Sequence, residues 1–443
     1  MTESTPAVSE RRRREVIDAL RRGSVPSQGL DLLAVGLNRF EQATDEELAT
    51  VAAGGAVFKA VRGEYGSGKT FFSRWLVERA RRAGFVSAEV QVSDTETPLH
   101  RLETVYRRIT ENLSTAELPP SALRDLVDGW IFTLERDAVA GGVAPDDEAA
   151  LETAVDTLLE RRLATVARTA PGFATALRAY REATLTGDIS QAEGLLAWLG
   201  GQPHVAASVK RAAGVRGDLD HFGAFGFLQG LLVMARDSGY SGLIVVLDEV
   251  ETLQRVRGDV RDKALNALRQ LIDEVHAGRF PGLYLLITGT PAFFDGAQGA
   301  QRLPPLAQRL ATDFTGDPRF DNPRAAQVRL PGFSHDSLVD LGVRTRDLYA
   351  IGSSPRVPLL VDDAYIGDLA TVMAGRLGGN VGVAPRLFLK KLVGDVLDRV
   401  DQFDDFDPRR DYALTVGVAE MDATEREAAS VDDIELDIDQ TDQ

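Results

Sequence analysis

The chain alternates between short, wholly apolar runs and longer segments in which apolar residues recur at every third or fourth position. A short apolar run is typical of a buried strand in a parallel sheet, and the longer period predicts amphipathic helices. Strands are predicted at 56–61, 85–92, 243–247, 283–288 and 327–330. The order strand, glycine-rich turn, helix, strand over 56–92 is the start of a parallel α/β sheet.

Helices are predicted before, between and after these strands. They are expected at 11–22, 30–40, 70–83, 99–113, 122–138, 148–168, 195–199 and 387–400. Four of them separate the second strand from the third, where an uninterrupted α/β pattern would place far fewer. The sequence therefore predicts a helical insertion within one α/β domain.

This pattern divides the chain into six segments. They are N-terminal helices (1–52), a first half of the α/β core (53–97), the helical insertion (98–237), a second half of the core (238–331), a C-terminal helical lid (332–402) and an acidic tail (403–443).

Composition excludes several classes of site. The 443 residues include no cysteine and five scattered histidines, so disulfides, thiol nucleophiles and zinc sites built on cysteine or paired histidines are excluded. No apolar run is long enough for a membrane helix. The polar N-terminus has no apolar stretch behind it. We therefore expect a cytoplasmic protein with no membrane partner.

Most of the net charge of −17 comes from the tail, and the body is nearly balanced. The tail has few aromatic residues, as disordered solubilising segments do. Its alternating Ile434, Leu436 and Ile438 also suit a segment that docks on a partner, and both interpretations remain open.

The turn after the first strand matches the phosphate-binding pattern G-x-x-x-x-G-K-[ST]. Glycines allow consecutive backbone N–H groups to face inward around phosphate oxygens, and the helix that follows adds the positive end of its dipole. The lysine reaches the β- and γ-phosphates, and the threonine hydroxyl ligates Mg²⁺. The residues are Gly63, Glu64, Tyr65, Gly66, Ser67, Gly68, Lys69 and Thr70.

The third strand delivers two carboxylates, Asp248 and Glu249, at its carboxyl end. Ligands of parallel α/β sheets bind at this edge. Behind a phosphate loop, Asp248 is expected to hold Mg²⁺ through water and Glu249 to polarise the attacking water. This pair favours an ATPase over a GTPase switch.

Three further positions are candidates for the same chemistry. A hydroxyl after the fourth strand can orient the attacking water, and Thr290 is favoured over Thr288. Arg309 can reach the γ-phosphate of a neighbouring subunit, and Arg386, in the first turn of the late helix, can reach back to the nucleotide. The simpler interpretations are a strand-end turn for Thr290 and solvated surface positions for the two arginines.

Taken in order, these motifs resemble an AAA+ ATPase, which implies a P-loop parallel α/β core with a large helical insertion and a helical lid. The Val25-Pro26 pair is similar to the segment on the adenine side of such sites. Pro385-Arg386 resembles the origin-recognition and helicase-loader branch. By this resemblance Thr290 is the first sensor, Arg309 the arginine finger and Arg386 the second sensor.

The runs at 62–72 (RGEYGSGKTFF) and 247–253 (LDEVETL), with the helical segment between them, resemble the ATP-binding proteins of bacterial BREX phage-defence islands. The short BrxD type is closer than the much larger BrxC type. Origin-recognition relatives carry a winged-helix DNA-binding domain after the lid, whereas an acidic tail follows it here. Contact with duplex DNA is therefore expected from the inserted helices or from Arg255, Arg257 and Arg261.

The function implied is an oligomeric AAA+ ATPase that binds and hydrolyses Mg-ATP at subunit interfaces. Hydrolysis would drive a DNA-directed step in phage defence, such as loading or regulating a partner helicase. Two alternatives remain: an ATP-gated signalling or assembly scaffold with little hydrolysis, and a DNA-binding regulator built on an AAA+ core.

Overall fold

A computed structural model describes residues 8–376 and 385–415. Its centre is a five-stranded sheet in the order β2-β3-β4-β1-β5, and every neighbouring pair of strands is parallel. This order is typical of AAA+ proteins, so the fold predicted from the sequence is confirmed. The strands are β1 (Val57–Arg62), β2 (Val86–Gln91), β3 (Leu243–Asp248), β4 (Leu283–Gly289) and β5 (Gln327–Arg329).

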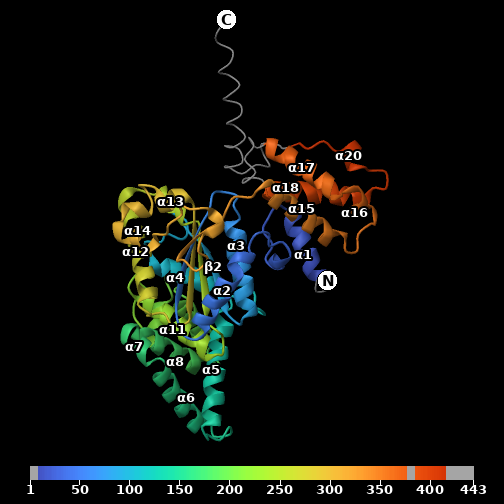
Figure 1. The fold of residues 1–443 in the computed structure, drawn as a ribbon. Helices are drawn as coiled ribbons and strands as arrows, with labels where there is room; N and C mark the ends of the chain where they lie inside the picture. The colour runs from blue at the N-terminus through green and yellow to red at the C-terminus, as the bar shows by residue number, and fades with distance from the viewer. Residues whose placement is uncertain (1–7, 377–384, 416–443) are drawn as a thin grey trace.

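Alternate side chains of the strands enter two different cores, because successive residues of a strand point to opposite faces. In β3, Ile244 and Val246 pack toward α2 (Asn38–Ala52) and α3 (Lys69–Arg82). Leu243, Val245 and Leu247 belong to the core on the other face, with α4 (Leu102–Glu111), α11 (Gly223–Asp237) and α12 (Gly258–His276). The sheet is therefore covered on both faces (Figure 1).

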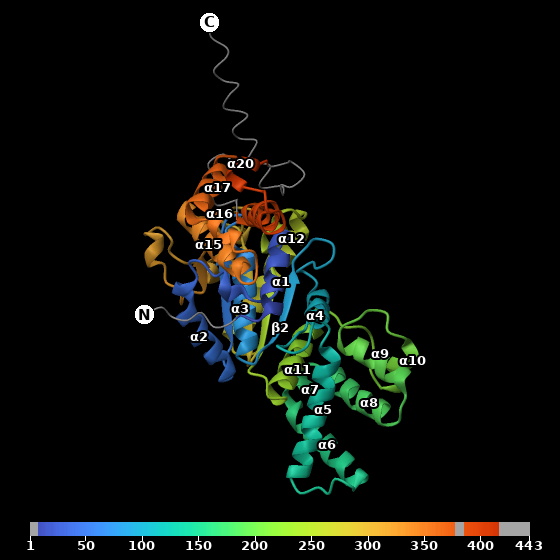
Figure 2. The same ribbon diagram turned by 90° about the vertical axis from the view of Figure 1, so that its right-hand side faces the viewer.

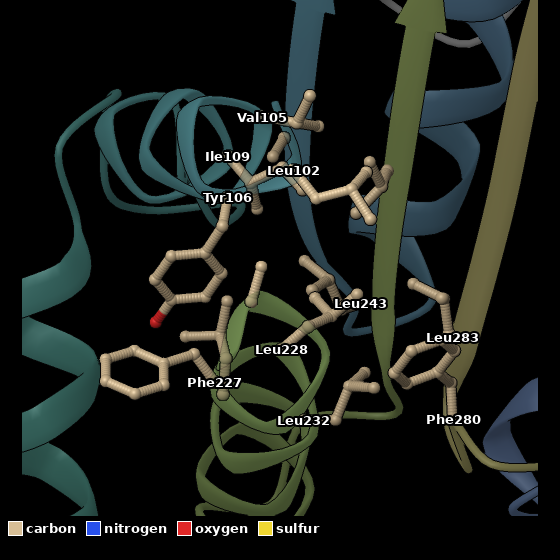
Figure 3. Close-up of a cluster of buried hydrophobic side chains, with 14 of the residues drawn as sticks. Leu102, Val105, Tyr106, Ile109, Phe227, Leu228, Leu232, Leu243, Phe280 and Leu283 are labelled. Atoms are coloured by element: carbon tan, nitrogen blue, oxygen red, sulfur yellow. The ribbon is translucent and has the colours of Figure 1, made fainter. Parts of the chain in front are cut away.

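The helices between β2 and β3 share one continuous core with the sheet. Figure 3 shows Leu228 of α11 beside the strand residue Leu243, with Tyr106 of α4 next to Phe227 of α11. The other helices between β2 and β3 continue from α4 and α11 away from the sheet, and α9 and α10 lie to one side of them (Figure 2). They are α5 (Leu123–Ala140), α6 (Glu148–Arg162), α7 (Ala164–Thr169), α8 (Pro171–Leu185), α9 (Ile189–Leu199) and α10 (Ala207–Ala212).

The C-terminal helices form a separate core that also includes α1 (Glu10–Arg21) from the start of the described chain. Val16, Ile17 and Leu20 of α1 are buried in it, and α1 lies beside α15 and α18 (Figure 1). Arg21 also forms a bidentate ion pair with Asp398, with distances of 2.6 and 2.9 Å. The helices are α15 (His335–Ala350), α16 (Arg356–Leu360), α17 (Asp363–Arg376), α18 (Pro385–Lys391), a π-helical stretch (Leu392–Leu397), α19 (Asp398–Gln402) and α20 (Pro408–Asp411).

Short helical elements complete the described chain, and none of its helices is both long and apolar enough to cross a membrane. They are η1 (Leu30–Leu32), η2 (Val250–Gln254), α13 (Pro291–Asp295), η3 (Ala300–Arg302), α14 (Pro304–Leu310) and η4 (Pro318–Phe320).

The structure corrects two of the predicted helices. The helix expected at 30–40 is the single 3₁₀ turn η1, and α2 begins only at Asn38. Gly36 adopts a left-handed φ of 74°, which ends any helix there. The helix expected at 148–168 is divided into α6 and α7 at Leu163.

Candidate nucleotide-binding site

The phosphate loop follows β1 and leads directly into α3. Gly66 and Gly68 have left-handed φ values of 76° and 88°, which favour glycine. A Cβ on Gly63 would meet Ser67 Oγ at 2.2 Å, so this position is also closed to larger residues. Ser67 Oγ is itself buried and has no hydrogen-bond partner in the described chain. An orphaned hydroxyl beside inward-facing backbone suits a bound phosphate.

Lys69 lies buried at the base of this loop. Its Nζ donates hydrogen bonds to the carbonyl oxygens of Gly63 at 2.8 Å and Glu64 at 3.1 Å. The ring of Tyr65 lies 5.1 Å from the ammonium. Burial lowers the pKa of Lys69, and the surrounding carboxylates, Glu251 first among them, oppose this shift. The Lys69 ammonium therefore contacts the loop carbonyls and is stabilised by the charges of nearby carboxylates.

Three neighbouring strands bring polar groups into one row at the carboxyl edge of the sheet. Gln91 on β2 is in register with Asp248 on β3, and Thr288 on β4 follows the residue paired with Leu247. Thr288 donates a hydrogen bond to Asp248 Oδ1, and the Asp248 Oδ2 atom accepts one from Thr70 Oγ1 at 3.2 Å. The paired hydroxyl and carboxylate oxygens of Thr70 and Asp248 fit the ligand preference of Mg²⁺.

Glu249 has an uncommon backbone conformation, with φ 61° and ψ 46°. A left-handed non-glycine residue costs about 1–2 kcal/mol and marks functional sites. The backbone N–H of Glu249 donates to Thr288 Oγ1 at 3.1 Å, and its Oε2 atom accepts from Gln91 Nε2 at 2.8 Å. The carboxylate is therefore held at the end of β2.

A cavity of about 490 Å³ lies between these groups and the C-terminal helices α15 and α18. Loop residues and carboxylates line it: Tyr65, Gly66, Ser67, Gly68, Lys69, Thr70, Asp248, Glu249 and Glu251. Apolar residues line it too, and they include Val25, Pro26, Leu33, Leu37, Phe40, Leu330, Phe333, Leu341 and Leu389. A lining with both polar and apolar residues suits a ligand that has a phosphate chain and a base.

The structure brings most of the predicted site residues into this cavity. Val25 and Pro26 line it, as the resemblance implies, and the Val25 carbonyl accepts a hydrogen bond from Arg74 at 2.7 Å. Arg386 reaches it from the first turn of α18. Gly63 and Glu64 do not line it, and instead they supply the carbonyl oxygens that hold Lys69.

Thr290 and Arg309 lie outside the lining of the cavity. Thr290 is buried at the start of α13, where its side chain caps no backbone N–H. Arg309 on α14 forms an ion pair with Asp273 of α12 and donates to the Pro305 carbonyl at 2.6 Å. Thr288, the alternative to Thr290 for orienting the attacking water, contacts both Asp248 and the Glu249 N–H.

Two residues of the site were not predicted as functional. Gln91 ends a strand with no motif around it, so only strand register reveals its position beside Asp248. Glu251 lies in the quoted run at 247–253, and its acidity was a signal that could have been used. Its side chain is 4% exposed and lines the cavity.

Among solved structures the chain is similar to the Aeropyrum pernix ORC1 protein in complex with DNA, with 14% identity and a TM-score of 0.36 over 94% of this chain and 69% of that one. It is also similar to the Aeropyrum pernix ORC2 protein in its ADPNP–ADP complexes, with 13% identity and a TM-score of 0.35 over 85% and 70%. No curated protein matches. The family model for the BREX system ATP-binding protein BrxC/D matches residues 8–416, and the chain therefore belongs to this family of ATP-binding proteins.

Proposed function

We propose that this protein is a Mg²⁺-dependent AAA+ ATPase. One observation carries the proposal: Lys69, Thr70, Asp248 and Glu249 line one cavity. These residue types supply a phosphate contact, two metal contacts and a base in hydrolytic P-loop sites. The apolar residues that line the same cavity would contact the base of ATP.

Each side chain has a distinct role in this proposal. Lys69 leaves the loop carbonyls and contacts the β- and γ-phosphates. Thr70 would hold Mg²⁺ directly and Asp248 through water, and the metal would neutralise charge on the phosphates. Glu249 polarises the attacking water, and Arg386 contacts the nucleotide from the lid.

We further propose that the protein acts as an oligomer. Arg309 does not line the cavity of its own chain, and a role at the γ-phosphate would therefore be exercised on a neighbouring copy. Its guanidinium lies on the surface formed by α12 and α14, where it is about 30% exposed. A neighbour that packs on this surface would receive the arginine.

The membership in a BREX family supports a role in phage defence, with hydrolysis coupled to a DNA-directed step such as the loading of a partner helicase. Arg255 and Arg257 are exposed on the loop after η2 and offer contacts for DNA phosphates. Arg261 is less available for this role, because its guanidinium donates to the carbonyls of residues 253, 254 and 256.

A second candidate is an ATP-gated scaffold with little hydrolysis. The hydrogen bond from Gln91 to Glu249 favours it, because a carboxylate held at the end of β2 is not free to approach a water at the γ-phosphate. Under this alternative, ATP binding alone would change the contacts between proteins.

The deciding experiment is the steady-state ATPase rate with and without Mg²⁺ and duplex DNA, at two salt concentrations. The ATPase proposal expects Mg²⁺-dependent hydrolysis that both Lys69→Ala and Glu249→Gln abolish. Stimulation by DNA that fades with salt would support the DNA-directed step. A negligible rate, together with defence that survives Glu249→Gln but not Lys69→Ala, would overturn the ATPase proposal in favour of the scaffold.

A further inference from the structure

Glu251 is a buried carboxylate that the proposed reaction does not use. It lies on η2, two residues beyond Glu249, and its side chain is 4% exposed in the wall of the nucleotide cavity. Neither Oε1 nor Oε2 accepts a hydrogen bond from another residue in the described part of the chain. Leaving such groups unpaired is unfavourable, so a carboxylate in this state calls for an explanation.

Lys69 supplies the main positive charge that acts on Glu251. Burial raises the pKa of the Glu251 carboxyl. A hydrogen bond from its own backbone N–H opposes this shift most, and the Lys69 ammonium is the largest charge that opposes it. In turn, Glu251 is the largest charge that supports the ammonium form of Lys69, ahead of Asp248. The two groups are not hydrogen-bonded, because Lys69 donates to the loop carbonyls of Gly63 and Glu64.

A bound nucleotide changes this balance. Its phosphates compete with Glu251 for the Lys69 ammonium, and they also bring negative charge close to a carboxylate that solvent does not screen. Asp248 and Glu249 share that cavity, but the reaction gives each of them a cation or a water to contact. In this reaction Glu251 contacts neither a cation nor a water, so Lys69 is the main positive charge that offsets its repulsion of the phosphates.

We propose that Glu251 is a positioning residue that competes with phosphate for Lys69 and thereby sets the rate of ADP release. The inference rests on the proposed function, since it assigns Lys69 to the phosphates. The ligand concerned is ADP, the product of the proposed hydrolysis. The physical expectation is that removal of this one buried charge tightens ADP binding and slows release.

The test is the release rate of ADP carrying a fluorescent group, measured by displacement with excess unlabelled ADP. Glu251→Gln keeps the shape and removes the charge, and we expect release to slow about tenfold. Glu251→Asp keeps the charge, and we expect release close to that of the wild type. If Glu251→Gln does not fold, Glu251→Ala removes the same charge.

Glu103→Gln is the matched control, because Glu103 Oε2 is also buried without a partner but lies outside the cavity. It should leave the release of ADP unchanged. Unchanged or faster release in Glu251→Gln, or a larger effect of Glu251→Asp than of Glu251→Gln, would overturn the inference and indicate a packing role. The release of ADP is measured without hydrolysis. A protein that binds ADP but does not hydrolyse ATP would therefore contradict the proposed function, and the effect of Glu251 on ADP release could still be determined.

Discussion

The side-chain amide of Gln91 donates a 2.8 Å hydrogen bond to Glu249 Oε2 and so ties the proposed base to the neighbouring strand. The two residues are 158 positions apart in the chain, and the register of β2 with β3 brings them together. Glu249 is also held by its backbone, which has a left-handed φ and donates to Thr288. The Glu249 carboxylate is therefore held in place. For hydrolysis it must either act from this position or move away from Gln91.

We expect Gln91→Ala to raise the basal ATPase rate by roughly threefold to tenfold. This exposed hydrogen bond is expected to contribute about 0.5–1.5 kcal/mol, and its loss frees Glu249 to approach the attacking water. The measurement is kcat at saturating ATP with no DNA or partner present. A lower kcat would show that Gln91 orients Glu249 for catalysis, and an unchanged value would show that the bond has no influence on the rate.

Thr288→Val is expected to lower kcat more than Thr290→Val does. The Thr288 hydroxyl donates to Asp248 and accepts from the Glu249 N–H, so its loss removes one hydrogen bond from each group. Asp248 keeps the bond from Thr70, and the Glu249 N–H keeps only its 3.2 Å bond to Asp248 Oδ1. We expect a fall of about tenfold to a hundredfold with little change in KM. Both threonines are buried and the substitution is nearly isosteric, so thermal unfolding of each variant separates a folding defect from a catalytic one. A larger loss for Thr290→Val would support Thr290, the residue favoured from the sequence.

Arg309→Ala is expected to lower kcat at least tenfold, because an arginine at the γ-phosphate stabilises charge in the transition state. The control is Arg302→Ala, which removes an arginine paired with Asp262 of the same helix α12 and should retain the wild-type rate. An experiment in which the Lys69→Ala and Arg309→Ala proteins are mixed decides whether Arg309 acts on a neighbouring subunit. Lys69→Ala copies carry an intact Arg309, and Arg309→Ala copies carry an intact site, so mixed oligomers should regain activity. Normal hydrolysis by Arg309→Ala at saturating protein concentration would remove the assignment.

The parts of the site that depend on neighbouring residues in the chain could be predicted from the sequence. The loop from Gly63 to Thr70 and the strand that ends in Asp248 are local patterns, and both have the predicted form. Gln91 could not be found in this way, because its contact with Glu249 depends on strand pairing. The choice between Thr288 and Thr290 likewise depends on where β4 ends relative to β3.

Helix α11 is not among the helices predicted from the sequence, and two glycines, Gly226 and Gly230, lie within it. A Cβ at Gly230 would meet the ring of Phe173 at 2.3 Å, and one at Gly226 would meet Ala170 Cβ at 2.6 Å. These glycines permit close packing of α11 against α7 and α8, and this requirement is visible only in three dimensions.

Glu78 on α3 anchors the segment before α2, and its removal should make the stability of the protein less dependent on acid pH. Its carboxylate accepts hydrogen bonds from the Gly29 and Leu30 N–H groups at 3.0 and 2.8 Å and from Arg12 and Arg82 at 3.0 and 2.6 Å. Burial alone would raise the pKa of Glu78, but the hydrogen bonds from Gly29, Arg82 and Leu30 outweigh it and lower the pKa below its ordinary value of 4.5.

A carboxyl group whose pKa is lower in the folded state stabilises the protein above the unfolded pKa and loses this effect as the pH falls through the folded value. Glu78→Gln should therefore reduce the free energy of unfolding by about 2–3 kcal/mol at pH 7. The difference from wild type should stay constant down to about pH 4.5 and shrink below it. Urea unfolding across this range measures it, with Glu10→Gln, an exposed carboxylate paired with Arg14, as the control. A difference that grows as the pH falls would contradict the assignment of Glu78 as an ionised anchor.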